Sequence, residues 1–270
     1  MSLTAEIKRQ LSANLSSGSE NPEMTLNNSL RLLSKWRSLL LQNTLLAQEG
    51  TVVSQGPLKG LDFIERSSEG CHVAKLLGCY EQPLQPFIVT ALSTGYVTIL
   101  NIGCAEGYYA VGFAKASPLL TSMAFDTDVK AQEACRLLAE KNGVSNRVLI
   151  HGSFEHNDFA KYENEKVLVF CDIEGAEEEL LNPELAPALR KLDIIVESHE
   201  CLRPGITQTL ISRFQESHSI ELIEDSGSRQ IDNPPGWFKR LSHLDQLLAT
   251  WEWRSGPTPW LVMHAKSGVN

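Results

Sequence analysis

The sequence predicts an α/β fold built on a doubly wound, mostly parallel sheet, and three observations carry this prediction. From residue 97 onward, short apolar segments alternate with amphipathic helical segments, as in parallel sheets that are covered by helices. A glycine turn joins the first apolar segment to the first helix. Polar residues follow several of the apolar segments, at the sheet edge where open α/β folds bind ligands.

The first predicted strand, residues 97–102, is a continuous apolar run and is therefore expected to be buried on both faces. Similar short runs predict further strands at 122–125, 148–151, 167–171, 194–197, 220–224 and 260–265. Helices are predicted between them at 108–115, 129–141, 185–191 and 205–217. A long loop, 225–259, separates the last two strands, which suits an antiparallel edge on a seven-stranded sheet.

An N-terminal helical extension is predicted before the sheet. Two helices, 4–16 and 25–48, flank the polar break 16–22, and Thr25 is the expected N-cap of the second. That helix carries one apolar stripe, Leu30, Leu33, Trp36 and Leu40 with Leu45 as a further candidate. Three roles stay open for it: closing over a substrate cleft, packing against a second subunit in a homodimer, or covering an exposed side of the sheet. Residues 51–96 are rich in turn signals. We predict an extension over 1–60 and a main domain over 61–270.

The amino-acid composition excludes several classes of protein. The chain has 270 residues, of which 42% are hydrophobic, and this is ample for a large core. A net charge of -9 argues against nucleic-acid or anionic-membrane partners. The six cysteines show no metal-type spacing and are expected to be reduced. The N-terminus lacks the apolar region of a signal peptide and no run has transmembrane length, so a cytoplasmic location is expected.

The glycine turn predicts a nucleotide-type cofactor. Gly103 and Gly107 permit close backbone approach, and Asp126, nineteen residues after Gly107, follows the second strand, where a carboxylate can bind both ribose hydroxyls. A dinucleotide fingerprint requires glycine where this chain has Ala105. The spacing therefore favours S-adenosylmethionine over a nicotinamide cofactor, although any tight strand-to-helix turn can use glycine.

At the ends of five successive predicted strands, most of the residues are polar or glycine. One or two such residues could simply cap the following helices, but five make a shared ligand site more plausible than chance. They are Asn101 and Gly103; Asp126 and Asp128; Gly152, Ser153 and Phe154; Asp172, Glu174 and Gly175; and Glu197, His199 and Glu200.

The segment Asp172-Ile-Glu-Gly-Ala-Glu177 resembles the D-[VI]-E-G-[AY]-E signature of FkbM-type S-adenosylmethionine-dependent methyltransferases. The segment 101–109 resembles the cofactor loop of that family. The resemblance covers residues 55–265 and is tightest over 97–200. It implies the seven-stranded, Rossmann-like fold of class I methyltransferases and S-adenosyl-L-methionine as the cofactor.

The resemblance also implies roles for individual residues. Gly103 and Gly107 would border the methionine part of the cofactor, Asp126 would hold the ribose, Ser153 and Phe154 would lie beside the adenine, and Asp172 would lie where cofactor and substrate meet. Asn101 and Glu106 complete the predicted cofactor contacts. Many class I enzymes have an acidic residue at the position of Asn101, whose amide keeps an acceptor oxygen but loses the charge.

A base is needed if the methyl acceptor is a hydroxyl of a small or sugar-like molecule, because the hydroxyl proton must leave. His199 is the first candidate, oriented by Glu197 or Glu200, and Asp172 is the second catalytic residue. His156 is the weaker alternative base. Either histidine could instead bind a loop carbonyl and have no chemical role.

Other interpretations stay open. A divalent metal could be held by Asp172, Glu174, Glu197 and His199, but helix caps and cofactor contacts explain these side chains equally well, so no metal is predicted. The tryptophans of the C-terminal insertion either shape an acceptor pocket or pin the loop to the core: Trp237, Trp251, Trp253 and Trp260. A non-catalytic binding or scaffold protein that keeps the methyltransferase fold is the alternative function.

Overall fold

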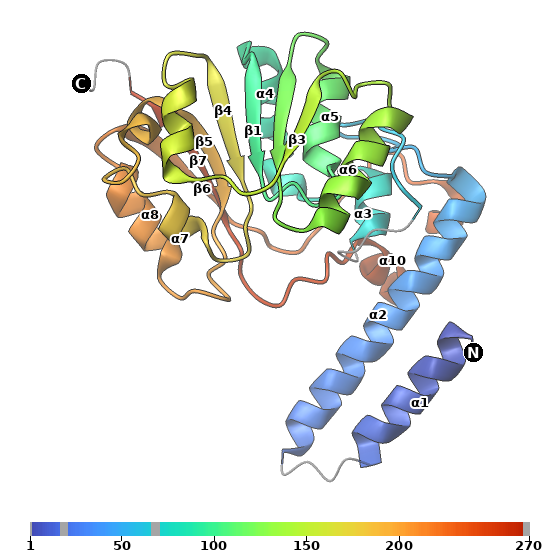
Figure 1. Cartoon of the computed structure of the whole chain (residues 1–270). Coiled ribbons are helices and arrows are strands. Elements are labelled where there is room, and N and C mark those ends of the chain that lie inside the picture. Colours follow the sequence, from blue (N-terminus) through green and yellow to red (C-terminus); the bar gives the residue numbers. More distant parts are fainter. Residues whose placement is uncertain (1, 17–20, 66–70, 267–270) are drawn as a thin grey trace.

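The protein is described by a computed structural model covering residues 2–16, 21–65 and 71–266. A seven-stranded sheet with helices on both faces forms the body, and a helical hairpin projects away from it (Figure 1). The strands are β1 (Thr98–Ile102), β2 (Thr121–Phe125), β3 (Val148–His151), β4 (Val167–Cys171), β5 (Asp193–Glu197), β6 (His218–Ile223) and β7 (Trp260–Ala265).

The strand order is β3-β2-β1-β4-β5-β7-β6, with β7 antiparallel to both of its neighbours and the other pairings parallel. This order confirms the predicted class I methyltransferase fold. From β1 the chain adds β2 and then β3 toward one edge of the sheet, and from β4 it adds strands toward the other edge. The strand order therefore reverses between β1 and β4. Ile102 pairs with Cys171 at their carboxyl ends. Gly103 and Asp172 therefore leave the sheet side by side.

Two apolar cores cover the two faces of the sheet. Along β4 the buried side chains alternate, so that Leu168 and Phe170 join one core while Val169 and Cys171 join the other. The first core takes in α3 (His72–Leu77), α4 (Gln85–Thr94), α5 (Tyr108–Ala116) and α6 (Val129–Lys141). The second takes in the 3-10 helices η2 (His156–Tyr162) and η3 (Pro187–Lys191), and α8 (Ile206–Phe214).

The largest differences from the predicted elements are in short helices, whereas the bounds of longer elements shift by up to three residues, as at α2, α8 and β6. The helix expected over 185–191 is the 3-10 helix η3. The turn-rich segment contains α3, η1 (Gln82–Leu84) and α4, and the expected loop 225–259 contains α9 (Gly236–Lys239) and α10 (His243–Thr250). A further short helix, α7 (Glu177–Leu180), follows β4. These helices have at most ten residues, fewer than the windows in which helical periodicity is detectable.

The hairpin consists of α1 (Leu3–Ser16) and α2 (Pro22–Glu49), which confirms the two predicted helices. Its turn, 17–20, lies outside the described residues. Asn21 rather than Thr25 caps α2, since its side chain accepts from the Met24 N–H at 3.1 Å and Pro22 occupies the first turn. The second half of α2 is anchored in the body through Leu41 and Leu45, which join the first core, and Arg31 in its first half donates to the Trp253 carbonyl at 2.7 Å.

The domain boundary expected at residue 60 stays a prediction. An antiparallel bridge between Val52 and Asp62 closes the chain around this position. Among the described helices, none is both long enough and apolar enough to cross a membrane.

Candidate active site

The larger of two neighbouring cavities lies at the carboxyl ends of β1 to β4. It encloses about 490 Å³, within the usual range for small-molecule and cofactor sites. Five of the predicted cofactor contacts line this first cavity: Gly103, Asp126, Ser153, Phe154 and Asp172. The structure thus brings together residues from four strand ends.

Gly103 forms the turn at the floor of the first cavity. Its φ of 80° lies in the left-handed region that favours glycine. A Cβ built at this position would lie 1.6 Å from the backbone oxygen of Asp172. The amides of Gly103 and Cys104 both donate to the Phe125 carbonyl at 2.9 Å. The turn is therefore fixed between β2 and β4, with no room for a side chain on the β4 side.

Asp126 is held rigidly at the wall of the first cavity. One carboxylate oxygen accepts from the Ala105 N–H at 2.9 Å, and the other accepts from the Asp128 N–H at 2.8 Å. Each carboxylate oxygen can accept a second hydrogen bond. The two oxygens can therefore take the two hydroxyls of a ribose without losing the backbone contacts.

Aromatic side chains form the apolar end of the first cavity. Phe154 is 8% exposed, and its ring packs edge-on against Phe125 and Phe159, each with centroids 4.7 Å away. Ser153 and Gly152 form the exposed rim beside it. A flat apolar wall next to a polar rim suits a purine base.

A narrow hollow lies behind the Gly103 turn. Its lining residues show whether the site fits the amino-acid end of S-adenosylmethionine. It is lined by Asn101, Gly103 and Asp172, among others. Asn101 is 2% exposed, and its Oδ1 has no hydrogen-bond partner among the described residues. A buried acceptor without a donor costs about 1–3 kcal/mol. The cofactor's amino group is a donor of the required kind, so the residues present fit this cofactor.

Glu106 and Gly107 lie outside the first cavity. The Glu106 carboxylate faces the hollow behind the turn and accepts from the Lys75 ammonium at 3.0 Å, with both side chains 2% exposed. A Cβ at Gly107 would lie 2.6 Å from the sulfur of Cys135. Packing of α5 against α6 therefore explains this glycine better than ligand approach does.

A second cavity of about 250 Å³ adjoins the first. Asp172 and Glu174 line both cavities. The remaining wall comes from β5, the segment that follows it and the C-terminal insertion, and includes Glu197, His199, Glu252, Trp253 and Arg254. A molecule in the second cavity would lie beside the Asp172 end of a ligand in the first.

His199 is buried in the wall of the second cavity and is held by Glu177. Its Nδ1 lies 2.8 Å from Glu177 Oε1, which also accepts from the Ile173 N–H at 3.0 Å and the Gly175 N–H at 3.2 Å. This leaves Nε2 on the side of Asp172 and Glu174, at 3.6 and 3.4 Å from their oxygens. The ring is thereby fixed in orientation.

Electrostatics favour the protonated form of His199. Burial acts to lower the pKa of its imidazole, but the hydrogen bond to Glu177 and the charges of Glu197, Glu177 and Glu174 outweigh burial. The pKa is therefore raised above its ordinary value. Burial acts to raise the pKa of the Glu177 carboxyl, but its hydrogen bond to His199, the charge of that ring and backbone hydrogen bonds together outweigh burial, so this pKa is lowered.

The carboxylate that orients His199 differs from the predicted ones. Glu197 is bound by Arg254, and its nearest oxygen is 3.9 Å from His199 Nε2. Glu200 turns away and accepts from the Thr207 hydroxyl at 2.7 Å. These two neighbours in sequence are thus engaged elsewhere, because the turn after β5 directs them to other elements.

The alternative base, His156, lines the first cavity, where its Nε2 is 2.9 Å from the Glu179 carbonyl oxygen. It therefore belongs to the first cavity and not to the second. Among the tryptophans, Trp237 and Trp260 are buried in the first core, as the packing interpretation predicts, whereas Trp253 lines the second cavity.

Three of the four proposed metal ligands come together. Asp172, Glu174 and His199 each offer one ligand atom, and these atoms lie within 4.8 Å of one another. Glu197 is not part of this group. The three side chains could hold a divalent cation only with a neutral imidazole, because a protonated Nε2 cannot coordinate a metal.

Several residues of the site carry no local sequence signal. Arg254 and Glu252 come from the insertion before β7, and Glu81 and Lys75 come from the turn-rich segment. The alternation of strands and helices does not predict which parts of these irregular segments meet the sheet edge. Glu177 was visible only as the last residue of the motif that begins at Asp172.

No protein-family model and no curated protein matches this chain. Among solved structures, it is similar to the O-methyltransferase TomG from Streptomyces achromogenes, involved in tomaymycin synthesis and solved with S-adenosylmethionine, at 13% identity, TM-score 0.49 and coverage of 84% of this chain and 96% of the other. It is also similar to an O-methyltransferase from Bacillus cereus in complex with S-adenosylhomocysteine, at 16% identity, TM-score 0.43 and coverage of 86% and 90%. These similarities concern the fold.

Proposed function

We propose that the protein is an S-adenosylmethionine-dependent methyltransferase that methylates a hydroxyl of a small-molecule acceptor. The observation that carries the proposal is the pair of adjoining cavities that share Asp172 and Glu174. The first suits a nucleoside with an amino-acid tail, and the second holds a buried histidine. Membership of the FkbM family is part of this proposal and rests on the Asp172–Glu177 motif.

The chemistry required of the protein is modest, because the cofactor supplies an already activated methyl group on a sulfonium. When bound in the first cavity, the cofactor would supply this methyl group to an acceptor hydroxyl in the second, and the hydroxyl proton would have to leave. His199 Nε2 takes the hydroxyl proton, provided that the imidazole is neutral at that moment. Glu177 then stabilises the resulting imidazolium through Nδ1. Orienting the two reactants supplies much of the remaining rate.

Asp126→Ala is expected to weaken S-adenosylmethionine binding by about 10²- to 10⁴-fold, because two hydrogen bonds to a charged group contribute about 1.5–3 kcal/mol each. Isothermal titration calorimetry measures this change. Asp128→Ala is the matched control, since Asp128 also follows β2 but its side chain caps α6 by accepting from the Lys130 N–H. Equal losses in the two variants, or no binding by the unmodified chain, would contradict the proposed cofactor site.

A chelator is expected to leave methyl transfer unchanged at neutral pH. Burial lowers the pKa of His199, but the hydrogen bond to Glu177 and the nearby carboxylates outweigh burial and raise it, so a proton competes with a cation for Nε2, which lies 3.6 and 3.4 Å from oxygens of Asp172 and Glu174. Turnover with and without EDTA, followed by readdition of Mg²⁺, measures the effect. Loss of activity that Mg²⁺ restores would show that the cluster is a metal site.

The second candidate function is a binding or scaffold protein with a methyltransferase fold. Asn101 favours this candidate, because an amide binds the cofactor's ammonium less strongly than a carboxylate does. Release of S-adenosylhomocysteine over a broad panel of hydroxyl compounds separates the two. Cofactor binding without turnover on any member of the panel would favour the scaffold.

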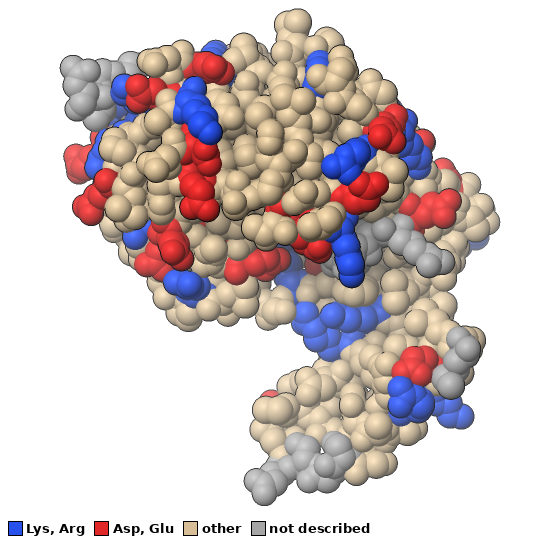
Figure 2. Space-filling model, in the orientation of Figure 1, with Lys and Arg blue, Asp and Glu red and all other residues tan. Residues whose placement is uncertain are grey.

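We also propose that α1 and α2 form a homodimer contact. The hairpin exposes six large apolar side chains, Leu3, Leu15, Met24, Leu26, Leu30 and Leu33, and most of its visible surface in Figure 2 is uncharged. We expect sedimentation velocity to show a dimer, and Leu26→Asp with Leu30→Asp to shift it to monomer, because buried charges oppose association. Leu119→Asp, at an exposed site on the sheet domain, is the control. A monomeric unmodified chain would refute this proposal.

A further inference from the structure

We propose that the methyl acceptor carries an ammonium or guanidinium group, which the second cavity binds while a hydroxyl of the same molecule faces His199. This inference rests on the proposed function for the location of the acceptor. It adds the charge class of the acceptor, which neither the fold nor the cofactor determines. The argument depends on the balance of charge around the cavity.

Carboxylates outnumber cations in the wall of the second cavity. Among the described residues that line it, four are acidic, Asp172, Glu174, Glu197 and Glu252, whereas only Arg254 and His199 can carry positive charge. Glu197 and Glu252 are buried, with side chains 4% and 3% exposed. Their charges are therefore weakly screened by solvent.

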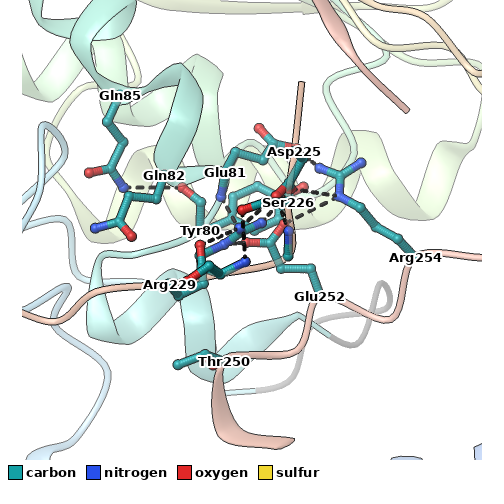
Figure 3. A network of polar contacts seen from close by, with 12 residues as sticks. Tyr80, Glu81, Gln82, Gln85, Asp225, Ser226, Arg229, Thr250, Glu252 and Arg254 are labelled. Atoms are coloured by element: carbon teal, nitrogen blue, oxygen red, sulfur yellow. Dashed lines mark hydrogen bonds and ion pairs between the residues drawn. The ribbon is translucent and has the colours of Figure 1, made fainter. Parts of the chain in front are cut away.

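The two arginines next to this wall, Arg229 and Arg254, already form ion pairs with carboxylates. Arg254 contacts Glu197, lies 2.9 Å from Glu81 and 3.3 Å from Glu252. Arg229 bonds Glu252 at 2.6 Å and Asp225 at 2.5 Å. Figure 3 shows the two guanidinium groups near the carboxylates of Glu81, Asp225 and Glu252. Four carboxyl groups thus share two guanidinium groups. Burial raises the pKa of Glu81 to about 8, so this group carries little charge at neutral pH, but Glu197, Glu252 and Asp225 still outnumber the two arginines.

Two observations on buried carboxylates agree with this excess. Burial, followed by repulsion from Glu197, raises the pKa of Glu81 despite the nearby Arg254. Glu177, which is completely buried behind His199, has one carboxylate oxygen, Oε2, with no hydrogen-bond partner among the described residues. The repulsion from Glu197 is the effect that an excess of carboxylates produces at Glu81, and Glu177 Oε2 adds a buried acceptor that no group among the described residues satisfies. The single positive charge of a bound sulfonium would not reverse the balance.

The excess of negative charge around the second cavity determines which charge on an acceptor it favours. A carboxylate or phosphate in the second cavity would face four acidic side chains and would be repelled. A cation would be attracted, and the aromatic rings of Tyr80 and Trp253, which also line the cavity, offer faces that suit an organic cation. A compact inorganic ion would gain less from these rings. We therefore assign the excess charge to an organic cation.

The test is a fragment screen by ligand-observed NMR on the full chain with S-adenosylhomocysteine bound, in EDTA. The library has equal numbers of cationic, neutral and anionic hydroxyl compounds of similar size. We expect cationic hits to exceed anionic hits at least about fivefold. Glu252→Gln should weaken the cationic hits about tenfold, which corresponds to about 1.4 kcal/mol. Glu133→Gln, on the exposed face of α6, should change nothing.

Two further arms keep the test decisive. Glu174→Gln, at a side chain 80% exposed, should weaken the same hits without endangering the fold, in case Glu252→Gln fails to fold. Equal hit rates in the three charge classes, a preference for anions, or no hit affected by either variant would overturn the inference. Failure of S-adenosylhomocysteine to bind would instead refute the proposed function. The same screen on the ligand-free chain would then still test the charge preference of the second cavity.

Discussion

Gly103→Ala is expected to lower the free energy of unfolding by about 3–5 kcal/mol and to abolish S-adenosylmethionine binding. A methyl group at this position would overlap the Asp172 carbonyl oxygen at 1.6 Å. Neither atom can move alone, since the Gly103 amide bonds the Phe125 carbonyl and the Asp172 amide donates to Ile102 at 2.9 Å. The variant must therefore separate β1 from β4 or deform the turn, and both responses cost stability.

The matched control is Gly143→Ala. Gly143 has a φ of 69°, also in the left-handed region, but a Cβ there would meet no atom within 4 Å. This variant isolates backbone strain, which costs about 1–2 kcal/mol, from the steric overlap. Urea unfolding measures stability, and calorimetry measures cofactor affinity. A Gly103→Ala protein as stable as Gly143→Ala would show that the turn is not tightly held between β2 and β4.

His199→Gln is expected to lower kcat by about 10²- to 10⁴-fold while the affinity for S-adenosylhomocysteine stays within about twofold. Glutamine can still donate to Glu177 but cannot accept the acceptor's proton. If the unmodified protein has the proposed activity, kcat/KM should rise with pH through an apparent pKa above 6.5, because the pKa of His199 is raised and only the neutral ring is a base. Activity is therefore lost as the pH falls.

His156→Gln serves as the control for this experiment. His156 also lies near the strand ends, but it belongs to the first cavity, so its replacement should leave both kcat and the pH profile in place. A His199→Gln enzyme with near-normal turnover would exclude His199 as the base. Loss of cofactor affinity in the same variant would instead indicate a structural role.

The parts of the fold that depend on local pattern were predictable. All seven strands were, because each contains a cluster of apolar residues; β1 and β4 are buried throughout, whereas β3 and β6 are buried only in part. The meeting of Gly103, Asp126 and Asp172 was also predictable, since parallel strands end at one edge. The short helices were not, because segments of four to ten residues have too little periodicity to reveal them.

The sequence by itself determined the sheet, its glycine turn and the row of polar residues at the strand ends, since each follows from the period of the apolar residues and from the backbone freedom of glycine. Only the tertiary structure decided which carboxylate orients His199. Glu177 is 22 residues away in sequence, yet it lies 2.8 Å from the ring, whereas the adjacent Glu200 bonds elsewhere. Such contacts depend on how irregular segments fold back onto the sheet, and their packing involves residues far apart in the chain. The acidic wall formed by Glu197 and Glu252 has the same origin.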